Sequence, residues 1–149
     1  MSVLEPPLSK QRLRVWLRML RAQRGMEHQL RDRLRLSHDC TLPRFDVLSA
    51  LDRHRDGLRM SDLSAKLKVS NGNVTGIIER LVGDGLVERT TVDGDRRAMR
   101  VRLTPLGLTR FAAMAQDHEL WVDGLLATYS ADELEHLIAL LERMGESEE

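Results

Sequence analysis

Residues 61–103 carry the clearest structural pattern of the chain: SDLSAKLKVSNGNVTGIIERLVGDGLVERTTVDGDRRAMRVRL. Within this stretch, apolar residues recur at helical spacing over residues 70–82, which predicts a helix with Ser70 as its N-cap. A shorter helix is predicted just before it, over residues 61–67, with Ser61 as its N-cap. Two helices joined by a short turn are typical of a helix-turn-helix. The apolar face of the second helix consists of Val74, Ile77, Ile78, Leu81 and Val82.

A hairpin is predicted directly after this pair of helices. Residues 86–91 and 98–103 have the composition of strands, and in the second strand arginines alternate with apolar residues. The charged segment 92–97 between them contains the turn signal Asp93-Gly94 and is predicted to form the hairpin tip. A helix-turn-helix followed by a hairpin has the order and size of a winged helix.

Long helices are predicted on both sides of the winged helix. Residues 8–36 form an amphipathic pattern, and a second helix over residues 42–54 has Thr41 as its N-cap. After the hairpin, Thr104 caps a helix that runs to about residue 128. A capping box at residues 130–133 opens the last helix, which reaches about residue 145. The predicted class is therefore mainly α, with a small β component.

The solvent-facing side of helix 70–82 suggests contact with DNA. Asn71, Asn73 and Thr75 have short polar side chains that can reach base edges, and a helix N-terminus favours phosphate. Arg80 lies on the same face, and Arg96 and Arg97 place guanidinium groups on a narrow hairpin that suits a minor groove. The alternatives are that the small polar residues only satisfy helix-capping preferences and that the hairpin is only a solvated turn.

The charge of the chain is balanced but unevenly distributed. The 149 residues contain 23 basic and 23 acidic side chains. The local net charge is +7 over residues 10–35, +3 over residues 59–103 and −9 over residues 117–149. A neutral total therefore conceals a basic centre that suits nucleic acid. The acidic C-terminal segment is predicted to lie against the arginine-rich first helix of the same chain or of a partner chain.

Composition excludes several classes of protein. No apolar run approaches the roughly 20 residues that span a bilayer, and the N-terminal residues MSVLEPPLSK lack an apolar signal core, so we expect a cytoplasmic protein without a membrane segment. A single cysteine, Cys40, excludes an internal disulfide framework and a cysteine-rich zinc site. Aromatic residues make up only 3% of the chain, which argues against a stacking platform for single-stranded nucleic acid.

The sequence resembles the MarR family of winged-helix transcriptional regulators over residues 10–145. Each motif is loose by itself, and their correct order makes the resemblance specific. The motifs are LPRFDVL (42–48), LSAKL (63–67), SNGNVT (70–75), LVGDGLV (81–87), DRR (95–97) and LTPLG (103–107).

The resemblance implies one MarR-type domain over residues 1–149, in which residues 42–103 form the winged-helix lobe that binds DNA. It also implies a homodimer, held together by the helices within 8–36 and 105–145, that binds a pseudo-palindromic operator in double-stranded DNA. The implied roles are major-groove contacts for Ser70, Asn71, Asn73 and Thr75, a wing-tip pair formed by Asp95 and Arg97, and a phosphate contact for Arg96.

The resemblance further suggests an effector pocket between the DNA-binding lobe and the dimerisation helices. Plain core packing is the alternative for its apolar members. Arginines on the first helix would attract an anion, such as an aromatic carboxylate or its coenzyme A thioester. The candidate effector-binding residues are Trp16, Leu20, Arg24, Phe45, His118 and Trp121.

Taken together, these features predict a ligand-responsive repressor that needs no cofactor and no metal. A winged helix that assembles with other proteins and has no operator is the main alternative. A regulator with Cys40 as a redox sensor is another, although a buried and inert thiol fits the neighbouring residues better. An enzyme is the weakest hypothesis, because the chain has neither a glycine-rich phosphate loop nor a cluster of the Ser/His/Asp type.

Overall fold

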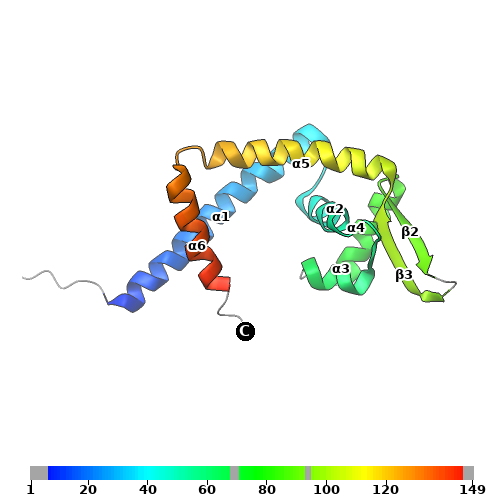
Figure 1. Ribbon diagram of the computed structural model, residues 1–149, viewed down its shortest axis with the longest axis horizontal. Coiled ribbons are helices and arrows are strands. Elements are labelled where there is room, and N and C mark those ends of the chain that lie inside the picture. Colours follow the sequence, from blue (N-terminus) through cyan, green and yellow to red (C-terminus); the bar gives the residue numbers. More distant parts are fainter. Residues whose placement is uncertain (1–6, 68–70, 93–94, 146–149) are drawn as a thin grey trace, which may run out of the picture.

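The computed structural model describes residues 7–67, 71–92 and 95–145. Within them the chain is mainly helical with one small antiparallel sheet, which confirms the predicted class (Figure 1). The elements are α1 (Leu8–His38), α2 (Leu42–Arg53), β1 (Leu58–Arg59), α3 (Met60–Leu67), α4 (Asn71–Gly83), β2 (Val87–Val92), β3 (Asp95–Leu103), α5 (Pro105–Leu125) and α6 (Ala131–Gly145).

Predicted helix caps are present at the starts of α2 and α6. The hydroxyl of Thr41 accepts a hydrogen bond from the Arg44 N–H at 3.3 Å at the start of α2. At the start of α6, Ser130 and Glu133 exchange two hydrogen bonds of 3.1 and 3.2 Å, which is the reciprocal geometry of a capping box. The cap assigned to Ser61 is wrong, because α3 begins one residue earlier, directly after β1, and Ser61 lies inside its first turn.

The core lies in the winged-helix lobe. Val74, Ile78 and Leu81 of α4 are fully or almost fully buried, as the helical pattern predicts. They belong to one cluster with side chains of α2, α3, the sheet and α5. In Figure 1 the lobe occupies one end of the molecule, and α5 leads from it along the top to α6. Burial of this apolar face therefore fixes which side of α4 remains exposed.

The sheet has the order β1-β3-β2. The two-residue strand β1 is too short to show an alternating pattern, and the sequence did not predict it. It pairs with the C-terminal half of β3, Leu58 opposite Val101. Gly57 precedes it with a φ of +102°, and a Cβ at this position would lie 3.0 Å from the Val101 carbonyl oxygen. A glycine is therefore required where the chain turns into the sheet.

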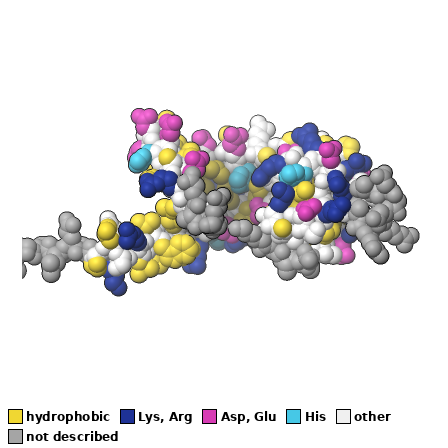
Figure 2. Space-filling model, turned by 60° about the horizontal axis from the view of Figure 1, so that its bottom comes forward, with side chains coloured by type: hydrophobic (Ala, Val, Ile, Leu, Met, Phe, Trp, Pro, Cys, Tyr) yellow, Lys and Arg dark blue, Asp and Glu magenta, His cyan; other side chains and the backbone are white. Residues whose placement is uncertain are grey.

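The outer helices expose much of their apolar surface. Helix α6 has no buried residue, although its apolar side chains are regularly spaced. Hydrophobic side chains also gather on the N-terminal part of α1 (Figure 2). The exposed large apolar residues of the two helices are Leu8, Leu13, Val15, Trp16, Leu17, Leu36, Leu137, Ile138, Leu140, Leu141 and Met144.

None of the helices in the described part of the chain has the length and apolar character needed to cross a membrane.

Candidate nucleic-acid interface

Helix α4 presents a polar face to solvent. Asn73, Thr75 and Arg80 are exposed, as is Gly76 between them, whereas Val74 is fully buried. This arrangement is the one that the apolar period of the helix predicts. The Arg80 guanidinium forms an exposed 3.2 Å ion pair with Asp84, one helical turn further along. Such a pair is weak in water, so Arg80 can exchange its partner for a phosphate.

Two further candidates lie at the start of α4. Asn71 is the first residue of the helix, and the structure describes its backbone but not the environment of its side chain. Ser70 lies outside the described residues. The DNA contacts assigned to both residues therefore stay predictions.

The wing is a longer hairpin than the sequence indicates. Strand β2 pairs with β3 from Val87 opposite Leu103 out to Val92 opposite Asp95, with a register irregularity between Thr90 and Val92. The strand assigned to residues 98–103 thus begins at Asp95, so the predicted tip over residues 92–97 is too long, and the predicted turn at Asp93-Gly94 lies outside the described residues. The ladder continues past the bulge because a β-bulge can absorb an extra residue without ending the pairing.

The three wing residues predicted to contact DNA consequently lie within β3 rather than in a loop. Asp95, Arg96 and Arg97 are the first three residues of this strand. The structure describes their backbone only. The DNA contacts assigned to these three residues therefore stay predictions.

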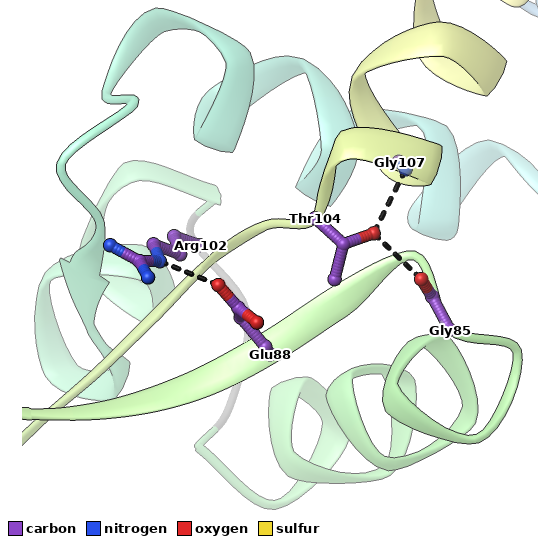
Figure 3. Close-up of polar contacts among 5 residues, drawn as sticks. All are labelled: Gly85, Glu88, Arg102, Thr104 and Gly107. Atoms are coloured by element: carbon purple, nitrogen blue, oxygen red, sulfur yellow. Dashed lines mark hydrogen bonds and ion pairs between the residues drawn. The ribbon is translucent and has the colours of Figure 1, made fainter.

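Polar contacts hold the base of the wing against α5 (Figure 3). The Thr104 hydroxyl donates a 2.6 Å hydrogen bond to the Gly85 carbonyl oxygen and accepts one of 3.0 Å from the Gly107 N–H, which confirms its predicted role as the cap of α5. Across the two strands, the Arg102 guanidinium donates a 2.7 Å hydrogen bond to the Glu88 carboxylate. The same side chain that caps α5 therefore fixes the turn between α4 and β2, which sets the position of the wing relative to α4.

Three of the candidate effector-binding residues meet at the junction of α2 and α5. The rings of Phe45 and His118 are stacked with centroids 4.7 Å apart. Trp121 packs against the same core and lies 6.2 Å from the His38 ring. His38 in turn contacts the Asp117 carboxylate at 2.7 Å. Phe45 is buried, so these residues form a packed joint between the lobe and α1, which is the alternative that the sequence left open.

The other three candidates lie apart from this joint. Trp16, Leu20 and Arg24 belong to the N-terminal two thirds of α1. Trp16 is 55% exposed, Arg24 is exposed, and neither Trp16 nor Leu20 packs against the core. The structure of one chain therefore does not bring the six candidate effector-binding residues together into one site.

A cavity of about 630 Å³ lies between α1 and α2. Gln23, Met26, Leu30, Leu42 and Pro43 line it together with two carboxylates, those of Glu27 and Asp46, and with the Arg31 guanidinium, which pairs with Glu27 at 2.9 Å. Partial burial raises the pKa of the Asp46 carboxyl above its ordinary 3.8, while nearby His118 opposes the shift and Glu27 adds to it. The sequence did not predict Met26, Leu30 or Pro43 as lining residues, because only the crossing of the two helices brings them together.

The single cysteine is poorly placed for redox chemistry. Cys40 is 4% exposed. Burial raises the pKa of its thiol to about 11, an effect that the charge of Arg44 only partly offsets. A buried thiol with a raised pKa is a weak nucleophile, which disfavours the redox-sensor alternative. No group of three or more His, Cys, Asp or Glu side chains within the described ranges could hold a metal ion.

Comparison with known proteins places these features in one family. Residues 38–98 match the family model described as "MarR family". A MarR family transcriptional regulator from Silicibacter pomeroyi has a crystal structure that is 31% identical, with a TM-score of 0.82 over 97% of this chain and 100% of that chain. A crystal structure of a mutant MarR from E. coli complexed with operator DNA is 24% identical, with a TM-score of 0.78 over 93% of this chain and 99% of that one.

A curated relative is the uncharacterized HTH-type transcriptional regulator YdgJ of Bacillus subtilis. It is 34% identical over 101 residues, which cover 68% of this chain and 61% of that protein. The chain spans about six tenths of the length of the curated relatives that it matches first.

Proposed function

The chain belongs to the MarR family of transcriptional regulators, and we propose that it is a homodimer that binds a pseudo-palindromic operator in double-stranded DNA and is released from it by a small-molecule effector. The observation that carries this proposal is the exposed polar face of α4 beside a hairpin wing. Residues 42–103 are the DNA-binding lobe, and the helices within 8–36 and 105–145 form the dimer, all in a single domain over residues 1–149.

The exposed face of α4 suits the major groove of DNA. That groove is about 12 Å wide and admits one α-helix. Asn73 and Thr75 are exposed near the start of α4 and offer amide and hydroxyl groups to base edges. Arg80, one to two turns further on, contacts phosphate, and Ser70 and Asn71 extend the contact surface at the helix start. The wing residues Asp95, Arg96 and Arg97 occupy the adjacent minor groove.

A second copy of the chain accounts for the exposed apolar surface of the outer helices. Apolar patches of this extent on a single chain mark an interface. The charge distribution points the same way. None of the ion pairs among the described residues joins a carboxylate of α6 to an arginine of α1. In the dimer, the acidic helix of one protomer lies near the arginines of its partner.

The effector occupies the cavity between α1 and α2, whose volume of about 630 Å³ lies in the range of small-molecule sites. An aromatic carboxylate or its coenzyme A thioester would meet Arg31 in the cavity wall and Arg24 on α1 outside the cavity. The two carboxylates of Glu27 and Asp46 outnumber Arg31 in the cavity wall, which disfavours an anion deep inside. An effector screen therefore includes neutral and cationic aromatic compounds beside the acids.

Release follows from a change in the separation of the two α4 helices. An effector that binds better to a conformation with misplaced lobes shifts the population towards it and lowers the affinity for DNA. The joint of Phe45, His118 and Trp121 connects the lobe to α1 and transmits this movement.

The test is a titration of the purified protein with its own upstream intergenic DNA and with a scrambled duplex, at two salt concentrations. We expect tight, salt-dependent binding with a clear preference for the intergenic duplex. Equally weak binding to both duplexes, followed by stable capture of a protein partner, would instead identify a protein-assembly module.

A further inference from the structure

A second groove lies where the C-terminal part of α1, the start of α2 and the outer side of α4 meet. Its volume is about 580 Å³. Arginines from three helices line it: Arg31 and Arg35 from α1, Arg44 from α2 and Arg80 from α4. Of these four arginines, only Arg80 was predicted from the sequence to contact DNA, because the other three are distant in sequence and meet α4 only in the folded chain.

The groove is strongly basic. Its lining contains no acidic side chain among the described residues. Arg31 pairs with Glu27 at 2.9 Å and Arg35 pairs with Asp32 at 3.7 Å, both within α1 and both exposed. Exposed pairs of this kind hold their partners weakly. No described carboxylate forms an ion pair with Arg44. All four guanidinium groups can therefore bind a phosphate by donating hydrogen bonds to its oxygens.

The groove is continuous with the exposed face of α4. Asn73 and Gly76 line the groove, and both also belong to the side of α4 that faces the bases in the proposed complex. No atom lies within 4 Å of the position that a Gly76 Cβ would take, apart from the helix itself and the chain neighbours. The outer wall of α4 is thus open at the point where another chain would approach it.

A helix in the major groove is flanked by the two sugar–phosphate backbones. One of them must run along the side of α4 that faces α1 and α2. We propose that this groove receives the backbone of one DNA strand and that Arg31, Arg35 and Arg44 contact its phosphates, which extends the interface from α4 onto α1 and α2. This inference rests on the proposed function, because it requires α4 to lie in the major groove.

Salt dependence measures such contacts directly. Each phosphate that a protein neutralises releases condensed counterions, and log K falls against log salt by about 0.9 per contact on duplex DNA. Phosphate contacts carry no sequence information, so their loss weakens binding to every duplex alike.

The experiment compares Arg35→Gln, Arg44→Gln and the double variant with wild type. Glutamine keeps a polar side chain of good helix propensity and removes the charge. The control is Arg55→Gln, which removes the same charge from an exposed position between α2 and β1, outside the groove and outside the helices of the proposed dimer. Fluorescence anisotropy with the upstream duplex and the scrambled duplex, at four salt concentrations, gives the slope for each protein.

We expect each single variant to lower the magnitude of the slope by about 1.8, because the homodimer loses one contact in each half-site, and the double variant to lower it by about 3.6, equally on both duplexes. Arg55→Gln keeps the wild-type slope. Circular dichroism melting confirms that all variants are folded. Wild-type slopes in the Arg35 and Arg44 variants would overturn the groove assignment alone. Failure of the wild type to bind any duplex would overturn the proposed function, and the inference with it.

Discussion

The Thr104 hydroxyl donates a 2.6 Å hydrogen bond to the carbonyl oxygen of Gly85, nineteen residues earlier in the chain. One side chain therefore joins the base of the wing, directly after β3, to the turn that follows α4. The same hydroxyl caps α5 through the Gly107 N–H. The Thr104 hydroxyl therefore joins the turn after α4 to the first turn of α5.

Replacing Thr104 by valine keeps the side-chain volume and removes both hydrogen bonds. We expect the free energy of unfolding to fall by about 1–3 kcal/mol, because a part-buried helix cap and an exposed hydrogen bond are lost together. Thr109→Val is the matched control, since its hydroxyl bonds only to the Pro105 carbonyl in an exposed helix. Urea unfolding measures both variants, and equal losses would show that the Gly85 contact contributes nothing.

Asn73→Ala tests whether α4 reads bases. The amide of Asn73 is placed on the exposed face of α4, where a contact to a base edge contributes about 1–3 kcal/mol of discrimination. We expect the affinity for the operator to fall by about that amount in each of the two half-sites, while the affinity for scrambled duplex hardly changes. Anisotropy titrations measure both. Equal losses on the two duplexes would contradict a base-reading role.

Ile138→Glu tests the dimer. Ile138 is 55% exposed in the single chain and lies in the apolar row of α6. If a partner covers this row, a buried and uncompensated carboxylate weakens the dimer by about 3–5 kcal/mol per site. Light scattering is expected to give twice the 17.0 kDa chain mass for wild type and the single mass for the variant. His136→Glu adds the same charge two residues earlier, on the opposite face of the helix, and should remain dimeric.

The thiol of Cys40 is expected to be inert in the folded protein. A pKa of about 11 leaves about one thiolate in 10⁴ molecules at pH 7. Reaction with a disulfide reagent should therefore be far slower in the native than in the urea-unfolded chain, and peroxide should not change DNA affinity. Rapid native labelling, or loss of DNA binding on oxidation that Cys40→Ala abolishes, would restore the redox-sensor hypothesis.

The raised pKa of the Cys40 thiol also makes the stability of the fold depend on pH above pH 9. The folded-state pKa of about 11 lies above the ordinary 9.0, so the protonated thiol favours the folded state. This contribution is fully present below pH 9 and is lost as the pH rises from 9 towards 11. Cys40→Ala lacks this part of the loss, and unfolding curves across that range reveal the difference.

Local sequence patterns predicted the helices and the hairpin. They did not predict the features that depend on long-range packing. Helix α4 was predictable to within one residue because its apolar period is unbroken from Val74 to Val82, and the caps at Thr41, Thr104 and Ser130 are short-range signals. The start of β3 and the strand β1 were missed, because one depends on a bulge and the other on pairing across the sheet.

The same distinction between local patterns and long-range packing applies to the candidate sites. The polar face of α4 was predictable from one helix alone. The arginine groove was not, because Arg35, Arg44 and Arg80 come from three helices whose packing no local pattern specifies. Sequence reasoning also grouped Trp16 with Phe45, Trp121 and His118 as one pocket. In the structure, the last three form a packed joint, while Trp16 stays exposed on α1.

A hydroxyl-radical footprint on the upstream intergenic DNA tests the central claim most directly, because it reports groove, spacing and symmetry together. A dimer with two α4 helices in successive major grooves protects two half-sites whose centres lie about 10–10.5 base pairs apart on one face of the duplex. The protected segments are also related by an approximate two-fold axis. A single unpaired protected segment, or uniform weak protection of intergenic and scrambled DNA alike, would contradict the account.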